Sequence, residues 1–96
     1  MATSTIKATE IRMVSGTKTV NPSGNNYATL FSSTEMTNMG FPTTPRPTVM
    51  VTNGDYSASG IQVVATSIQN GAVVVHFNTA TSNTTRINYT ICRATA

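Results

Sequence analysis

The stretch from Pro45 to Arg93 reads PRPTVMVTNGDYSASGIQVVATSIQNGAVVVHFNTATSNTTRINYTICR. It contains four runs rich in β-branched and aromatic residues, at positions 48–52, 61–68, 72–77 and 86–91. Each run has the length of a β-strand, and the gaps between runs are rich in Asn, Gly, Asp and Ser, which favour turns. The sequence therefore predicts an all-β fold, a small antiparallel β-sandwich of about six strands.

Working outward from this stretch, the N-terminal half supplies the remaining strands. Residues 6–20 are Thr-rich and alternate in polarity, and Gly16 interrupts them, so they predict one long strand with a bulge, or a hairpin. Residues 27–31 predict the next strand. Further along, Asn70-Gly71 lies between two β runs, and both residues accept the positive φ of a tight turn. This pair predicts a β-hairpin.

The segment between the two halves differs from the rest of the chain. Residues 33–40 predict one helical turn, capped by Ser33 or Thr34 and stopped by Gly40. A helix this short is expected to plug one end of the core. Three prolines within residues 42–47 then require an extended segment that leads into the strand at 48–52.

The faces of the strands follow from the two-residue period of a β-strand. Apolar residues at alternate positions share a face, which predicts a core of Val49, Val51, Val73, Val75, Phe77, Ile87, Tyr89 and Ile91. The intervening polar residues His76, Asn78, Arg86 and Asn88 are then expected to point away from the core.

Length and composition indicate one domain. The 96 residues suffice for one modest core, so residues 6–96 are expected to form a single sandwich and residues 1–5 to be a linker remnant. Charged residues make up 9%, and nineteen threonines supply much of the polarity. Uncharged, Thr/Asn-rich surfaces are common on extracellular and virion proteins. The sequence shows no secretory signal and no run approaching the about 20 apolar residues that span a bilayer, so no membrane insertion is expected.

Charge and chemistry argue against several classes of function. Six Lys/Arg against three Asp/Glu give a net charge of +3, but the basic residues are scattered, whereas a nucleic-acid interface gathers them in a stripe. The single cysteine, Cys92, cannot form an intramolecular disulfide, and its expected role is that of a small, partly buried side chain. One histidine and three dispersed acidic residues are too few for a usual metal site. We therefore expect no nucleic-acid partner, no metal, no cofactor and no enzymatic activity.

Two candidate ligand sites remain. The loop at 53–60 offers Asn53, Asp55 and Tyr56, which combine hydrogen-bonding groups with an aromatic ring, as saccharide sites do; the alternative is an exposed turn in which Asp bonds its own backbone. The second candidate is a sheet face on which His76, Arg86 and Asn88 would converge, provided that the last two strands pair. The alternatives there are a solvated outer face and a hydrated trimer axis.

The order of motifs resembles the distal C-terminal domains of phage tail fibres and receptor-binding proteins, and is similar in plan to the six-stranded sandwiches of H-type lectins. The residues that carry the resemblance are Met39-Gly40-Phe41-Pro42, Pro47-x-Val49-x-Val51, the Asn-Gly hairpin and Ile87-x-Tyr89-x-Ile91, within residues 9–94. The lectin-type ending normally carries Trp, whereas this chain has Tyr89 there and no Trp. The resemblance implies a sandwich fold and recognition of a host surface, without a particular ligand specificity.

The expected function is accordingly that of the tip domain of a phage tail fibre, located in the virion, which binds a bacterial cell-surface glycan or protein. The resemblance also implies a homotrimer, and Met36 and Met39 are apolar residues expected to be spare for contacts between copies. The alternative is a trimerisation or decoration module of a virion or bacterial surface fibre with no ligand of its own. An accessory domain of a glycan hydrolase is a third possibility.

Overall fold

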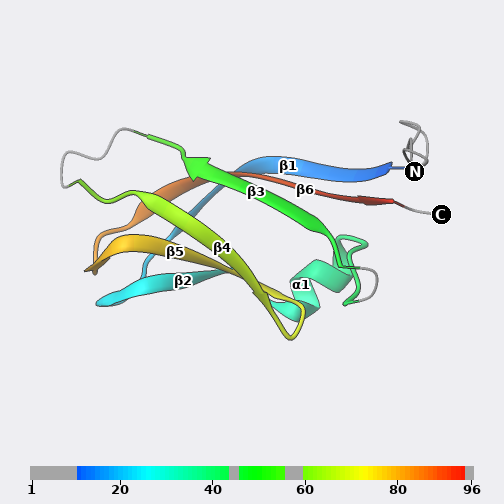
Figure 1. The fold of residues 1–96 in the computed structure, drawn as a ribbon, viewed down its shortest axis with the longest axis horizontal. Helices are drawn as coiled ribbons and strands as arrows, with labels where there is room; N and C mark the ends of the chain where they lie inside the picture. The colour runs from blue at the N-terminus through cyan, green and yellow to red at the C-terminus, as the bar shows by residue number, and fades with distance from the viewer. Residues whose placement is uncertain (1–10, 44–45, 56–59, 95–96) are drawn as a thin grey trace, which may run out of the picture.

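The computed structural model describes residues 11–43, 46–55 and 60–94. Its elements follow in the order β1 (Ile11–Val20), β2 (Asn25–Phe31), α1 (Ser33–Asn38), β3 (Thr48–Asn53), β4 (Val63–Gln69), β5 (Ala72–Thr81) and β6 (Thr85–Ala94). The strands form two antiparallel three-stranded sheets, with strand orders β1-β6-β3 and β2-β5-β4. Figure 1 shows the sheets as two layers, with α1 at the end where β1 begins and β6 ends. The predicted all-β sandwich of six strands is confirmed.

The chain changes sheet at almost every connection. Among the described strands, only β4 and β5 are consecutive neighbours within one sheet, and they are joined through Asn70 (φ 52°) and Gly71 (φ 84°) as the Asn-Gly pair predicts. The other connections pass from one sheet to the other, including the short link from β5 to β6. This topology decides which polar side chains can meet on a face.

The core lies between the inner faces of the two sheets. Of the predicted core residues, Val73, Val75, Phe77, Ile87 and Ile91 are buried, and Val49, Val51 and Tyr89 are half-buried and packed against them. The two-residue period therefore identified the inner faces correctly. The core also takes in residues that the period did not single out: Val20, Ala28, Leu30, Phe31, Met36, Phe41 and Ile61.

β1 runs through Gly16 as one strand. It pairs with β6 residue by residue from Ile11 to Val20 without a shift in register, so neither the predicted bulge nor the hairpin is present in the described residues. Gly16 is opposite Tyr89, and a Cβ at this glycine would lie 2.8 Å from the Tyr89 Oη. The missing side chain is thus replaced by the tyrosine ring, which packs edge-on against Phe31 at 4.9 Å between centroids.

The predicted helical turn is α1, but its cap is Ser32 rather than Ser33 or Thr34. The Ser32 hydroxyl accepts from the Glu35 backbone N–H and the Glu35 carboxylate accepts from the Ser32 backbone N–H, which forms a capping box. The six-residue helix ends at Asn38, and Gly40 (φ 94°) then turns the chain away from the helix direction. No helix among the described residues is long and apolar enough to cross a membrane.

Residues around α1 close one end of the core, as predicted. The Phe41 N–H donates to the Met36 carbonyl, and the Gly40 N–H donates to the Thr37 carbonyl. These hydrogen bonds satisfy carbonyl groups of the last helical turn and bring the Met36 and Phe41 side chains inward. Both side chains are 1% exposed. Met36 is therefore a core residue, and the expectation that it is spare for contacts between copies is wrong.

The capping box also makes the stability of the fold sensitive to acid. The hydrogen bond from the Ser32 backbone and the nearby Lys18 ammonium lower the pKa of Glu35 below its ordinary value. A carboxylate with a lowered folded-state pKa stabilises the fold above its unfolded pKa, and this contribution is lost as the pH falls through the folded pKa. We therefore expect Glu35→Gln to lower the urea midpoint at pH 7, and its curve to meet that of the unchanged protein once the pH has fallen through the lowered folded-state pKa of Glu35.

Asp55→Asn is the matched control for this measurement. Asp55 forms only an exposed ion pair in the described residues, and exposed pairs contribute little to stability. Identical pH profiles for the Glu35 and Asp55 variants would contradict a role for the capping box.

Candidate functional site

The sheet topology separates the residues of one predicted site. His76 lies on β5 in the β2-β5-β4 sheet, whereas Arg86 and Asn88 lie on β6 in the β1-β6-β3 sheet. The condition for this site, that the last two strands pair, is not met, because the β5–β6 link crosses between the layers. His76 therefore cannot form a common face with Arg86 and Asn88. On its own sheet, Asn88 accepts a hydrogen bond from the Thr17 hydroxyl at 2.9 Å.

The other predicted site, the loop at 53–60, contains residues that serve the structure. The Asn53 amide donates to the Ile61 carbonyl at 3.1 Å and accepts from the Val63 N–H at 2.9 Å, so it joins the end of β3 to the start of β4. The Asp55 carboxylate lies 3.4 Å from the Arg86 guanidinium. Tyr56 lies outside the described residues.

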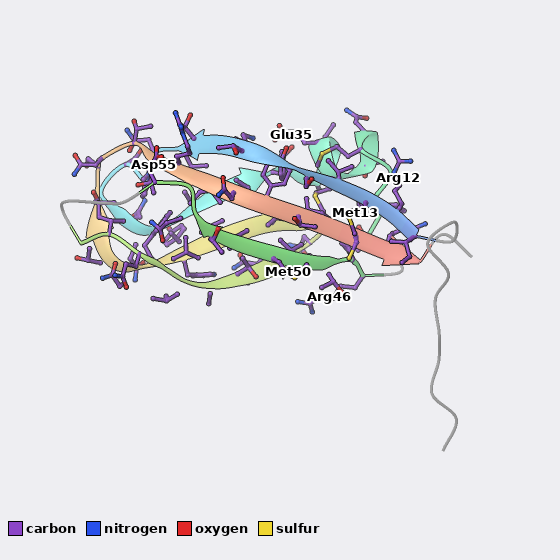
Figure 2. The ribbon with its side chains drawn as sticks, turned by 90° about the horizontal axis from the view of Figure 1, so that it is seen from above. Arg12, Met13, Glu35, Arg46, Met50 and Asp55 are labelled. Atoms are coloured by element: carbon purple, nitrogen blue, oxygen red, sulfur yellow. The ribbon has the colours of Figure 1, made fainter. Side chains whose placement is uncertain are left out.

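Asp55 and Arg86 are thus brought together although they were assigned to different sites. Gly54 allows this approach, since its N–H donates to the Arg86 carbonyl and a Cβ there would lie 2.5 Å from the Arg86 Cγ. Figure 2 places Asp55 at the end of the sandwich away from Arg12. Both charged side chains are more than half exposed, so the pair remains accessible, but each group already has its counter-charge.

His76 belongs to a hydrogen-bonded chain on the outer face of the β2-β5-β4 sheet. Its Nε2 lies 2.8 Å from the Ser67 Oγ, and the Gln69 amide donates to the same hydroxyl at 3.0 Å. When the Ser67 hydroxyl donates to Nε2, the neutral imidazole carries its proton on Nδ1, which is left as a donor for a ligand oxygen. The hydrogen bonds through Ser67 and Gln69 therefore hold the imidazole ring in place and leave its Nδ1–H group as a donor.

Tyr27 lies beside His76 and completes an aromatic surface. The two residues are register partners across β2 and β5, their ring centroids are 6.5 Å apart, and Tyr27 is 49% exposed. Ala65, which has a small side chain, is the register partner of His76 on β4. Register shifts occur next to this row in both β2 and β4. Such irregularities re-aim side chains, and they are frequent next to functional sites.

A shallow groove adjoins this surface on the other side of Tyr27. It has a volume of about 350 Å³ and is lined by the end of β1, the turn after it and the first half of β2. Its polar lining residues include Asn21, Ser23, Asn25 and Thr29, together with Tyr27 itself. Tyr27 therefore stands between a groove rich in amides and hydroxyls and the His76 ring.

The charge of this region is nearly zero. Lys18 lines the groove, but its ammonium donates to the Leu30 carbonyl, lies 3.4 Å from the Glu35 carboxylate and covers the Phe31 ring. Among the described residues no group of three His, Cys, Asp or Glu side chains could hold a metal ion. The Tyr27–His76 surface, defined as Tyr27, His76, Ser67, Gln69 and the adjoining groove, is thus suited to an uncharged, hydroxyl-bearing ligand.

Sequence reasoning found His76 but missed Tyr27, Ser67 and Gln69. The run Asn21-Pro22-Ser23-Gly24-Asn25-Asn26-Tyr27 carried a usable signal, because an aromatic residue directly after an Asn-rich turn can place its ring beside free amides. The partners on β4 carried none, since only the sheet order reveals that this strand flanks His76.

Comparisons of this chain with protein-family models, with curated protein sequences and with solved structures each found no match.

Proposed function

We propose that the protein is a non-enzymatic recognition domain that binds a neutral glycan through the Tyr27–His76 surface. The observation that carries the proposal is the pairing of a half-exposed aromatic ring with a fixed imidazole beside an uncharged amide-rich groove. In keeping with the sequence resemblance, we place this domain at the tip of a phage tail fibre, where the ligand is a bacterial cell-surface glycan.

The chemistry of the surface fits a saccharide. The apolar face of a pyranose ring can lie on the Tyr27 ring, which combines a large apolar body with a polar edge. The sugar hydroxyls then meet the His76 imidazole, the Asn25 amide, which can donate as well as accept, and the NH2 group of Asn21, whose oxygen already accepts from the Ser23 N–H. A charged sugar gains less at this surface, because Lys18, the cation in the groove lining, is already paired.

A shallow site of this kind binds one sugar weakly, with a dissociation constant of roughly millimolar, and gains useful strength from several copies on one tip. The proposed homotrimer supplies those copies. Its contact surface is proposed to be the open side of the sandwich at β3 and β4, two edge strands with no charged residue and no proline. Edge strands are usually protected by such residues. On this side Met50 (56% exposed) and Val64 (61% exposed) border a hollow of about 300 Å³.

The same open side favours the alternative function, a trimerisation or decoration module without a ligand. A glycan array probed with the full chain, together with light scattering at micromolar concentration, separates the two. We expect binding to neutral glycans and a mass about three times that of the 10.1 kDa chain. A blank array with a trimeric mass would support the structural module instead, and binding by a monomer would remove the trimer from the proposal.

A further inference from the structure

Two arginines lie directly opposite each other at the α1 end of the β1-β6-β3 sheet. Arg12 on β1 is the register partner of Arg93 on β6. Each is two residues from a neighbour that packs on the core, since Val14 follows Arg12 and Ile91 precedes Arg93. Like charges that are directly opposite each other in an antiparallel pair destabilise the sheet. The arrangement therefore calls for a counter-charge.

Only the Nε atom of the Arg12 guanidinium forms a hydrogen bond with the described residues. Its Nε donates to the Met39 carbonyl at 2.6 Å, and its Cζ lies 6.0 Å from the centroid of the Phe41 ring. The two terminal nitrogens form no hydrogen bond with the described residues. Since a guanidinium has five N–H donors, most of the capacity of Arg12 is left for another partner.

Arg93 has an unmet demand for hydrogen bonds. The residue is half-buried, and its Nε and Nη1 atoms are shielded from solvent but have no hydrogen-bond partner among the described residues. Buried donors of this kind are rare in folded proteins, and leaving one without a partner is unfavourable, more so when the group is charged. The Arg93 guanidinium thus has hydrogen-bonding capacity that no described residue uses.

The part of the chain that the structure describes contains no free carboxylate for this pair. Glu35 is engaged by Ser32 and Lys18, and Asp55 is paired with Arg86. Figure 2 shows Asp55 at the opposite end from Arg12, whereas the exposed Arg46 lies toward the same end as Arg12. Three arginines therefore gather at this end without an anionic partner in residues 11–43, 46–55 and 60–94.

We propose that the Arg12–Arg93 pair is a carboxylate-binding site that receives an Asp or Glu side chain from an acidic segment of a partner protein. Guanidinium groups match the planar carboxylate and bind it with charge-assisted hydrogen bonds. Arg12 is exposed and offers its terminal nitrogens directly, whereas the Arg93 Nε and Nη1 atoms are covered, so the Arg93 side chain has to turn outward to share the carboxylate. The site is separate from the Tyr27–His76 surface and gives the domain a second, protein-binding function.

The proposal is tested with a hexaglutamate peptide and a hexaglutamine peptide of equal length, titrated into the full chain at low salt. We expect the glutamate peptide to bind and to shift the Arg Nε–Hε NMR signals of Arg93, and the glutamine peptide to do neither. Arg93→Met should weaken binding about 30-fold, because it leaves the carboxylate without its partner. Arg46→Met removes an exposed charge from the same end and should change binding by about twofold or less.

A second readout distinguishes a binding group from a structural one. Arg93→Met removes an unpaired buried charge from the free domain, so it should raise the thermal midpoint by about 4 °C while it weakens peptide binding. Arg12→Gln should weaken peptide binding without a comparable rise in the thermal midpoint. This variant also tests the site if the Arg93 variant fails to fold.

Three results would overturn the proposal. One is equal binding of the glutamate peptide to the Arg93→Met and unchanged proteins. Another is a loss of stability in Glu10→Gln accompanied by new peptide binding, which would assign the carboxylate to Glu10 of the same chain. The third is tighter binding of an oligogalacturonate than of the peptide, which would make the ligand an acidic glycan.

Discussion

Phe41→Ala is expected to cost about 4 kcal/mol of the free energy of unfolding, far more than the truncation of an exposed residue. The Phe41 side chain is 1% exposed and closes the core at the α1 end. Its removal leaves a cavity next to Met36 and takes away the aromatic ring that lies under the Arg12 guanidinium. Since domains of this size have roughly 5–15 kcal/mol of stability in total, the variant should unfold at a much lower urea concentration.

Met13→Ala is the matched control for this loss. Met13 is also a large apolar residue, but it is 60% exposed on the edge strand β1, away from the proposed trimer contact, so its truncation should change the stability by about 0.5 kcal/mol or less. Urea unfolding followed by circular dichroism measures both values. Equal losses in the two variants would show that the 39–43 segment does not close the core.

The fold could be predicted from the sequence to a large extent because its signals are local. Alternation along 72–77 and 86–91 places Val75, Phe77 and Ile91 on inner faces, and the structure confirms their burial. Phe41 was not predicted to be buried because it follows a helix stop and precedes a proline-rich segment, where neither the strand period nor the helix period applies. Its burial depends on the turn at Gly40, which directs the chain back over the end of the core.

The candidate site could be predicted only in part because it depends on sheet order. The two-residue period correctly placed His76 on an outer face, but its grouping with Arg86 and Asn88 required that β5 and β6 pair, and the chain instead crosses between sheets there. The observed sheet order gives His76 the neighbours Tyr27 and Ser67 in place of Arg86 and Asn88. The distance along the chain between Tyr27 and His76 is 49 positions, and no local pattern links residues so far apart.

The largest expected effect on function comes from the aromatic ring at the centre of the proposed glycan site. Tyr27→Ala should weaken binding to the neutral glycans of the array about 30-fold, because a central aromatic contact commonly contributes about 2 kcal/mol or more to an interface. Tyr27→Phe keeps the ring and should retain most of the binding if stacking dominates. Because Tyr27 is 49% exposed on an edge strand, the free energy of unfolding should change by about 1 kcal/mol or less in either variant.

Variants of the neighbouring residues locate the site. His76→Ala should weaken binding about tenfold, since it removes the imidazole donor that Ser67 and Gln69 hold in place. Asp55→Ala combined with Tyr56→Ala should leave binding unchanged. Asp55 follows β3 of the β1-β6-β3 sheet and is paired with Arg86 at 3.4 Å, whereas the proposed site lies on the β2-β5-β4 sheet. If the Asp55/Tyr56 variant loses binding while Tyr27→Ala and His76→Ala retain it, the recognition surface is the 53–60 loop. The aromatic and imidazole groups on the β2-β5-β4 face would then be a surface feature without a ligand, since no change in fold stability could account for that pattern.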